Sequence, residues 1–140
     1  MGTPTLREIE DKIVETLNGT GDFNFVISIP KGEKPLKTIV HPAAFVYFES
    51  DVLQANKTRP VYTNYFAVII EHFIGKNGID TYYLIDKARD VLQGNKFGFS
   101  DITPMLCEKR NLVVFEEGII EYLLIFSVDT YLPVPLGWRR

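Results

Sequence analysis

Hydrophobic residues recur at helical spacing in two stretches of this chain. The first stretch begins at Thr5-Leu6-Arg7-Glu8, a capping-box pattern, and ends at Asn18-Gly19. The second follows Asp80, which can cap a helix, and ends at Gly94. The apolar positions are Leu6, Ile9, Ile13, Val14 and Leu17 in the first stretch, and Tyr83, Leu84, Ala88, Val91 and Leu92 in the second. These patterns predict two amphipathic helices.

The remaining apolar stretches have the patterns of strands. Ala43 to Phe48 is apolar at every position, which predicts a strand covered on both faces in the middle of a sheet. Two stretches alternate: Phe23 to Ile29, with Phe23, Phe25, Ile27 and Ile29 on one face, and Tyr62 to Ile74, with Phe66, Val68, Ile70 and Ile74 on one face. Leu106 to Phe115 and Ile119 to Tyr131 are two further strand-like runs, and Glu116-Glu117-Gly118 joins them as a hairpin connection.

The order of elements is therefore α-β-β-β-α-β-β, with no internal repeat or linker. This order predicts an α+β fold in one domain over residues 1–140, a mostly antiparallel sheet with two amphipathic helices packed on it. The strand that begins at Tyr62 would reach about 43 Å at ~3.3 Å per residue. A domain of this length has a radius of gyration of only about 14 Å. Such a strand must bend or extend beyond the body, where a neighbouring subunit can cover it.

Polar, turn-forming stretches predict the loops. Pro30 to Pro35 should be exposed, Glu49 to Pro60 should form a long irregular loop, and Gly75 to Gly78 should form a turn. Asn95 to Pro104 is expected to be a loop anchored by Phe97 and Phe99. The end of the chain, residues 132–140, is a proline-rich arm that cannot continue a central strand, because proline has no N–H for the ladder. Two interpretations remain open: the arm packs on its own domain, or Trp138 and Arg139 dock on a partner.

The composition excludes several classes of protein. A net charge of -3 argues against binding to a phosphate backbone, because that affinity comes from Lys and Arg. A double-stranded-RNA-binding domain shares the leading α-β-β-β-α order, but here the helix after Asp80 carries acidic residues that would repel RNA. The longest apolar runs are too short to span a bilayer. With one cysteine, Cys107, the chain cannot form an internal disulfide or a thiolate cage for zinc.

No pattern in the sequence predicts a catalytic, cofactor or metal site. His72 follows Glu71 in an alternating strand, and His41 precedes Pro42 at the start of a strand; structural roles explain both histidines better than catalysis. Cys107 has apolar neighbours, which disfavour the reactive thiolate. Asp86 and Asp90 share a helical face interleaved with basic residues, as on a solvated helix. We therefore expect a protein that is not an enzyme and needs no cofactor.

Three segments resemble a known family. They are Ile9-Glu10-Asp11-Lys12-Ile13-Val14 with Leu17, Pro42-Ala43-Ala44-Phe45-Val46-Tyr47-Phe48-Glu49, and Gly78-Ile79-Asp80-Thr81-Tyr82-Tyr83-Leu84-Ile85-Asp86 running to Leu92-Gln93-Gly94. They are similar to the opening helix, the Pro-Ala strand and the second helix of the tail terminator family of Mu-like contractile-tailed phages. The similar order of elements continues through Ile102-Thr103-Pro104-Met105 and Glu121 to Phe126.

The resemblance implies a structural virion protein, found in the tail and, during assembly, in the host cytoplasm. Such a subunit forms a ring, hexameric in that family, which ends tail polymerisation and contacts the tail tube, the sheath and the head connector. A closed ring needs two different complementary patches on each subunit. Residues expected at subunit or tail contacts are Glu49, Asp51, Tyr62, Tyr65, Trp138 and Arg139. The alternative function is a non-enzymatic adaptor that captures one partner with a sheet edge or the arm.

Overall fold

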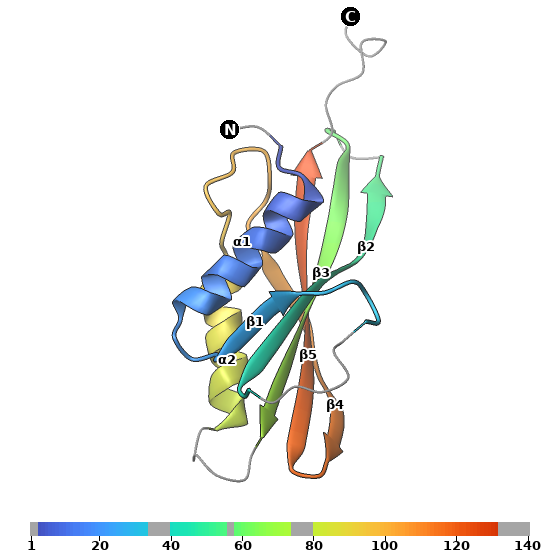
Figure 1. Cartoon of the computed structure of the whole chain (residues 1–140). Coiled ribbons are helices and arrows are strands. Elements are labelled where there is room, and N and C mark those ends of the chain that lie inside the picture. Colours follow the sequence, from blue (N-terminus) through green and yellow to red (C-terminus); the bar gives the residue numbers. More distant parts are fainter. Residues whose placement is uncertain (1–2, 34–39, 56–57, 74–79, 132–140) are drawn as a thin grey trace, which may run out of the picture.

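The first helix, α1, spans Leu6–Gly19 and begins with the predicted capping box. The Glu8 amide donates to Thr5 Oγ1 at 3.1 Å, and the Thr5 amide donates to Glu8 Oε1 at 2.8 Å. Two of the amides that a helix start leaves unpaired are thereby satisfied. The computed structural model describes residues 3–33, 40–55, 58–73 and 80–131, with only the backbone of residues 114–116 (Figure 1).

Five strands of the described residues form one sheet, and their order is β1-β2-β3-β5-β4. Their bounds are β1 Phe25–Ser28, β2 Ala43–Gln54, β3 Val61–Phe73, β4 Leu106–Glu116 and β5 Ile119–Tyr131. β1 runs parallel to β2, and the other three pairs are antiparallel. The second helix, α2, spans Thr81–Leu92 and lies beside α1 on the same face of the sheet (Figure 1). The predicted α+β class, single domain and order of elements are confirmed.

The main core lies between the two helices and this face of the sheet, which we call the helix face. Alternate residues of β3 point into it, and Phe66, Val68 and Ile70 are fully buried there as predicted. The helices contribute Ile9, Ile13 and Leu17 from α1 and Leu84, Ile85, Ala88 and Leu92 from α2. Tyr83, predicted on the apolar side of α2, is instead 49% exposed, and Ile85 is buried, because the contacts of α2 with α1 and the sheet decide which side of the helix is covered.

A second, smaller cluster covers part of the opposite face of the sheet. Ile29, Ala43 and Phe45 form it, with Ile27, Tyr47 and Ile69 packed around them. The prediction that Phe23 shares a face with Phe25, Ile27 and Ile29 is wrong. β1 begins only at Phe25, so Phe23 precedes the alternation and packs into the main core under α1. As predicted, Ala43 to Val46 is covered on both faces and lies between β1 and β3.

The predicted loop from Glu49 to Pro60 is wrong over its first half. Glu49 to Gln54 continues β2, and the segment Ser50 to Gln54 pairs with β3 from Tyr65 back to Val61. The polar side chains gave no strand pattern because Ser50 to Leu53 is exposed on both faces. Backbone hydrogen bonds to β3 hold this segment without the apolar alternation that burial of one face imposes.

The two longest strands, β3 and β5, pair along their whole length from Val61 with Tyr131 to Phe73 with Ile119. The predicted hairpin between β4 and β5 is confirmed, and Glu117 and Gly118 both have positive φ, as a tight hairpin turn requires. Phe97 and Phe99 anchor the loop after α2 to the main core, also as predicted. Pro30 to Glu33 is exposed. The turn predicted at Gly75 to Gly78 and the arm at 132–140 lie outside the described residues.

Candidate interaction surface

The sheet has two outer edges that differ in how they are covered. β1 pairs with β2 only along Ala43 to Val46, and the Ile29 amide donates to Val46 O at 2.8 Å as the last contact. Beyond that point β2 continues for eight residues to Gln54, and no described strand pairs with that side of it (Figure 1). We call the regular part of this segment, Ser50 to Gln54, the β2 edge. Unpaired strand edges are templates for pairing with another chain.

Apolar side chains are exposed on both faces of the β2 edge. Val52 is 50% exposed and Leu53 is 47% exposed, and adjacent residues of a strand point to opposite faces. Register places Asp51 and Leu53 on the helix face, opposite Asn64 and Tyr62 of β3. These exposed apolar residues were missed in the sequence, where Val52-Leu53 inside a polar run was the available signal.

The predicted contact residues do not form one patch. Tyr62 lies on the helix face and Tyr65 on the opposite face, because three positions separate them on β3. Both tyrosines are half-buried. Asp51 is exposed on the β2 edge. Trp138 and Arg139 lie outside the described residues.

Glu49 is already engaged within the chain. Its Oε2 accepts from Lys31 Nζ at 2.9 Å, and that hydrogen bond raises the pKa of Lys31 above its ordinary value. Glu49 also sits at the β-bulge between Phe48 and Ser50, which bends β2 where β1 ends. The pair therefore marks the boundary between the covered and uncovered parts of β2.

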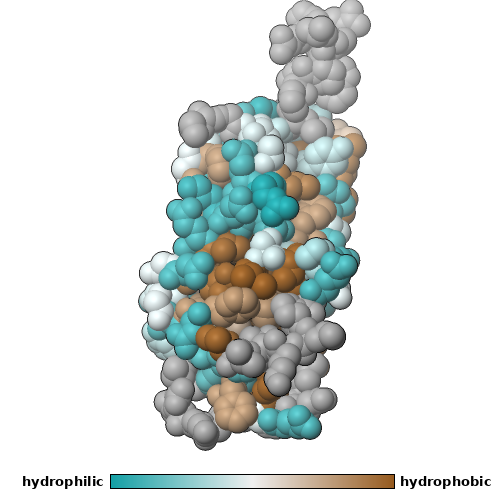
Figure 2. All heavy atoms as spheres, in the orientation of Figure 1, coloured by the Kyte–Doolittle hydropathy of each residue, from teal (hydrophilic) through white to brown (hydrophobic). Residues whose placement is uncertain are grey.

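A hollow of about 380 Å³ opens on the helix face where β1 ends. Its lining includes Phe48 and Ile29 as apolar floor, Arg7 and Glu10 from α1, and Lys31. Glu10 is mostly buried and accepts a hydrogen bond from Ser28, so it is satisfied within the chain. Figure 2 shows apolar surface gathered over the middle of this side of the molecule, next to the polar outer surface of α1. The hollow lies alongside the uncovered part of β2.

The other edge of the sheet is β4, and no strand among the described residues pairs with its outer side. Leu106, Leu112 and Val113 are each more than 50% exposed, and Glu108 to Asn111 are exposed as well. A second hollow, of about 290 Å³, adjoins this edge on the helix face and is lined by Tyr82, Ile85, Asp86, Arg110 and Tyr122. Within the part of the chain that the structure describes, each side of the sheet thus has an unpaired strand edge and a neighbouring hollow.

The chain resembles known proteins in fold rather than in sequence. No family model matches, and no curated protein matches. A chain in the solved structure of the virion of a native gene transfer agent particle does match in fold. It is 11% identical, with a TM-score of 0.58, and the likeness covers 89% of this chain and 95% of that chain. At that identity the likeness shows the fold alone.

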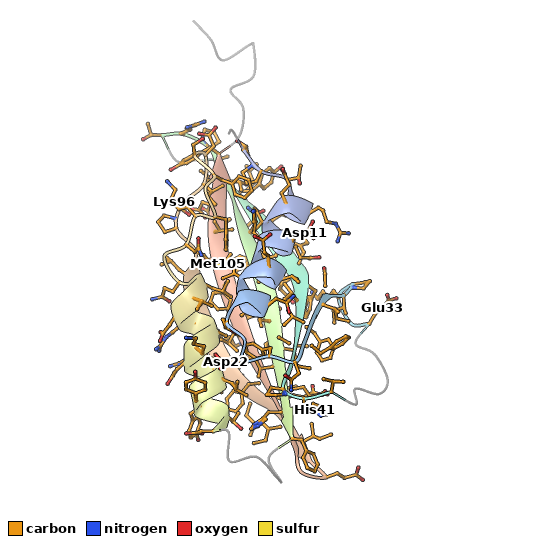
Figure 3. All side chains as sticks on the ribbon, turned by 60° about the vertical axis from the view of Figure 1, so that its left-hand side comes forward. Asp11, Asp22, Glu33, His41, Lys96 and Met105 are labelled. Carbon is orange, nitrogen blue, oxygen red and sulfur yellow. The ribbon has the colours of Figure 1, made fainter. Side chains whose placement is uncertain are left out.

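The residues with catalytic potential make separate structural contacts. His41 Nε2 lies 2.8 Å from Glu71 Oε1, and His72 Nδ1 lies 2.8 Å from Thr81 Oγ1 at the start of α2. Burial raises the pKa of the Cys107 thiol, which disfavours the thiolate. Neither hollow is lined by any of these three side chains. Figure 3 shows His41 at the end of the molecule away from Lys96.

The described parts of the chain hold neither a metal cluster nor a membrane-spanning helix. Among those residues, no group of three or more His, Cys, Asp or Glu side chains is placed to hold a metal ion. Within the same residues, no helix is long and apolar enough to span a bilayer. As predicted, Asp86 and Asp90 lie on an exposed helix face; Asp86 pairs with Arg89 and Arg110, and Asp90 pairs with Arg89.

His72 should make the stability of the fold depend on pH. Burial, and secondarily the charge of His41, lower the pKa of His72 from its ordinary 6.5, against a smaller opposing effect of Asp80. Below about pH 6.5 the unfolded chain therefore binds a proton that the folded chain resists. We expect the free energy of unfolding to fall as pH drops below this value, by at most about 1.4 kcal/mol per pH unit from this group.

Urea denaturation of the wild type and of His72→Asn between pH 7.5 and 5 measures this dependence. The Asn amide can keep the contact with Thr81 but does not titrate, so the variant should lose this part of the slope. Equal slopes in both proteins would show that His72 is not responsible.

Proposed function

We propose that this chain is a structural component of a phage-type virion and acts as a tail terminator. The observation that supports this most is the fold shared with a chain of the gene transfer agent virion along nearly the full length of both chains. The resemblance of Pro42 to Glu49 and of the second helix to Mu-like tail terminators supports the same assignment.

In this role the protein forms a ring, a hexamer by analogy with the family, on the finished tail tube. The ring ends tube polymerisation and presents a surface to the head connector, while the sheath lies alongside. Its partners are copies of itself and other virion proteins, and it acts without a cofactor, without nucleic-acid specificity and without a membrane. The two sheet edges that no described strand pairs with lie on opposite sides of each subunit, and this arrangement suits a heterologous ring.

Cross-linking followed by native mass spectrometry tests the ring. We expect species of one defined subunit number, either from the chain alone at high concentration or after adding the tail-tube protein of the same genome. The control is the same measurement at high dilution without tube protein, where the ring should dissociate. A chain that remains monomeric in the presence of the tube protein, or forms only a one-to-one complex with it, would contradict the assignment.

A non-enzymatic adaptor is the second candidate function. The observation that favours it is the β2 edge, since an exposed edge can capture an extended peptide from an unrelated protein. A persistent one-to-one complex, with no closed ring under any condition, would support the adaptor and exclude the terminator.

Trp138 provides a direct measure of whether the C-terminal arm docks on a partner, because it is the only tryptophan in the chain. If Trp138 and Arg139 contact a neighbouring component, Trp138 fluorescence should shift to the blue on assembly, and Trp138→Ala should weaken assembly by roughly tenfold or more. The control is Arg140→Ala, which keeps the tryptophan. An emission maximum that is identical in the monomer and the assembly would contradict docking of the arm.

A further inference from the structure

We infer that neighbouring subunits join by pairing the β2 edge of one copy with β4 of the next, so that their sheets become continuous. This inference rests on the proposed ring, and it names the two surfaces that meet. Both surfaces belong to the described residues, and they lie at opposite sides of the same sheet. A single type of junction, repeated around an axis, therefore uses both of them in every copy.

Strand direction favours this junction. β2 is antiparallel to β3, β3 to β5, and β5 to β4, so β2 and β4 run in opposite directions. When one sheet continues into the next without a reversal of the subunit, the new pair is antiparallel, like the three antiparallel pairs within the chain. Neither subunit has to change its fold to form this antiparallel pair.

Charge is complementary on the helix face of the sheet. There Asp51 of the β2 edge would meet Arg110 of β4, and in the same antiparallel register Leu112 of β4 would lie level with the bulge beside Phe48. Asp51 has no ion-pair partner among the residues that the structure describes. Arg110 reaches Asp86 with Nη1 at 3.2 Å, and a guanidinium has five N–H donors, so one such contact does not exhaust it.

Apolar residues are exposed at the same places. Val52 and Leu53 on the β2 edge, and Leu112 and Val113 on β4, are each about half exposed in the isolated subunit. Leu112 lies on the helix face of β4, opposite Tyr122 of β5, so it is the side chain placed to enter the hollow beside Phe48 in the next copy. Pairing the strands removes these apolar surfaces from water at the same time as it satisfies the strand edges.

The register within the sheet sets the geometry of the junction. Across the sheet, the β2 edge lies at the same height as Ser127 to Tyr131 of β5. β4 pairs with the other part of β5, from Ile119 to Ser127. Successive copies must therefore be displaced along the strand direction. A ring closes with such a displacement only when its strands are tilted relative to the ring axis, as strands are in a closed barrel.

Charge reversal tests the junction with two variants of the full chain, Asp51→Lys and Arg110→Glu. Each variant alone places like charges across every junction, and we expect association to weaken roughly tenfold per junction. An equimolar mixture should recover assembly, because the lysine introduced in one variant then meets the glutamate introduced in the other, while the remaining junction keeps its native charges. The recovered ring should alternate the two variants, which native mass spectrometry resolves.

Matched controls carry the same charge changes away from both edges. Glu15→Lys lies on the exposed side of α1, and Lys96→Glu lies in the loop before β4 (Figure 3). Both controls should assemble like the wild type. Thermal unfolding of all four variants shows whether any loss of assembly comes from loss of folding, and the recovery in the mixture requires that both reversed chains are folded.

The outcomes separate this inference from the proposed function. If Asp51→Lys alone and Arg110→Glu alone each form rings as readily as the wild type, the inferred junction is overturned and the proposed ring is not. Open chains of no fixed number that respond to charge reversal as expected would support the junction and overturn the terminator. A wild type that shows no cross-linked species at about 1 mM, with or without tail-tube protein, would overturn both.

Discussion

Phe66→Ala should lower the free energy of unfolding by about 3–5 kcal/mol. Phe66 is fully buried near the middle of β3, the central strand of the sheet, and belongs to the core that both helices cover. Its ring packs edge to face against Phe48, with centroids 5.6 Å apart. The strand cannot move to fill the space, since β2 and β5 hold β3 on both sides, so the substitution leaves a cavity and removes the aromatic contact.

Phe25→Ala is the matched control for this prediction. Phe25 is 37% exposed on β1 at the side of the sheet, although its ring also packs edge to face, against Phe45 at 6.3 Å. We expect a loss well below that of Phe66→Ala, about 1–2 kcal/mol, because water already reaches the site. Urea denaturation followed by far-ultraviolet circular dichroism measures both. Comparable losses would mean that the core is not centred on β3.

Asn64→Ala should lower the free energy of unfolding by about 1–3 kcal/mol. Asn64 is 1% exposed, and its Nδ2 donates to Thr130 Oγ1 at 3.0 Å, Val128 O at 3.1 Å and Tyr62 O at 3.3 Å. Alanine removes the donor while Val128 O and Thr130 Oγ1 stay where water reaches them poorly. The cost of leaving buried acceptors unpaired exceeds the net value of an ordinary hydrogen bond.

Asn111→Ala is the control for the amide itself. Asn111 is exposed on β4, so the same chemical change there should alter stability by no more than about 0.5 kcal/mol. A loss at Asn64 no greater than at Asn111 would show that the buried amide contributes little. If Asn64→Ala also changes the dependence of the free energy of unfolding on denaturant concentration, the end of β3 and β5 at Val61 and Tyr131 separates before the rest of the sheet.

Asn64 and Asp51 occupy the same register position on neighbouring strands but differ in burial. The two residues are cross-strand partners on the same face of the sheet, yet Asn64 is buried and Asp51 is exposed. The main core therefore ends between β3 and β2 at this level. In the proposed ring, β4 of the next copy would supply the cover that the isolated chain lacks beyond β2.

The sequence predicted the elements that bury one side. The capping box at Thr5 and Glu8, the apolar spacing of α1 and the alternation of β3 were all found in the structure as predicted. In each case burial on one face fixes which positions are apolar, and the period of that pattern differs between helix and strand. The order of the elements follows from the same patterns, and so does the α+β class.

The sequence could not predict elements whose partners are remote and whose faces are exposed. Glu49 to Gln54 has a loop-like composition, and only its backbone pairing with Val61 to Tyr65 makes it a strand. The burial of Ile85 and the exposure of Tyr83 depend on how α2 packs against α1 and the sheet. No local pattern encodes these choices, because hydrogen bonds between backbones are independent of side-chain type.

The candidate interaction surface was likewise predictable only in part from the sequence. The sequence by itself determined that the chain has apolar strands, no recognisable catalytic motif and acidic residues such as Asp51 near the long strand. Only the tertiary structure decided that β2 continues past the end of β1, that β4 lies at the opposite side of the sheet, and that Asp51 and Arg110 both lie on the helix face. Whether a strand lies at an edge depends on which other strands pair with it, and that pairing exists only in the folded sheet.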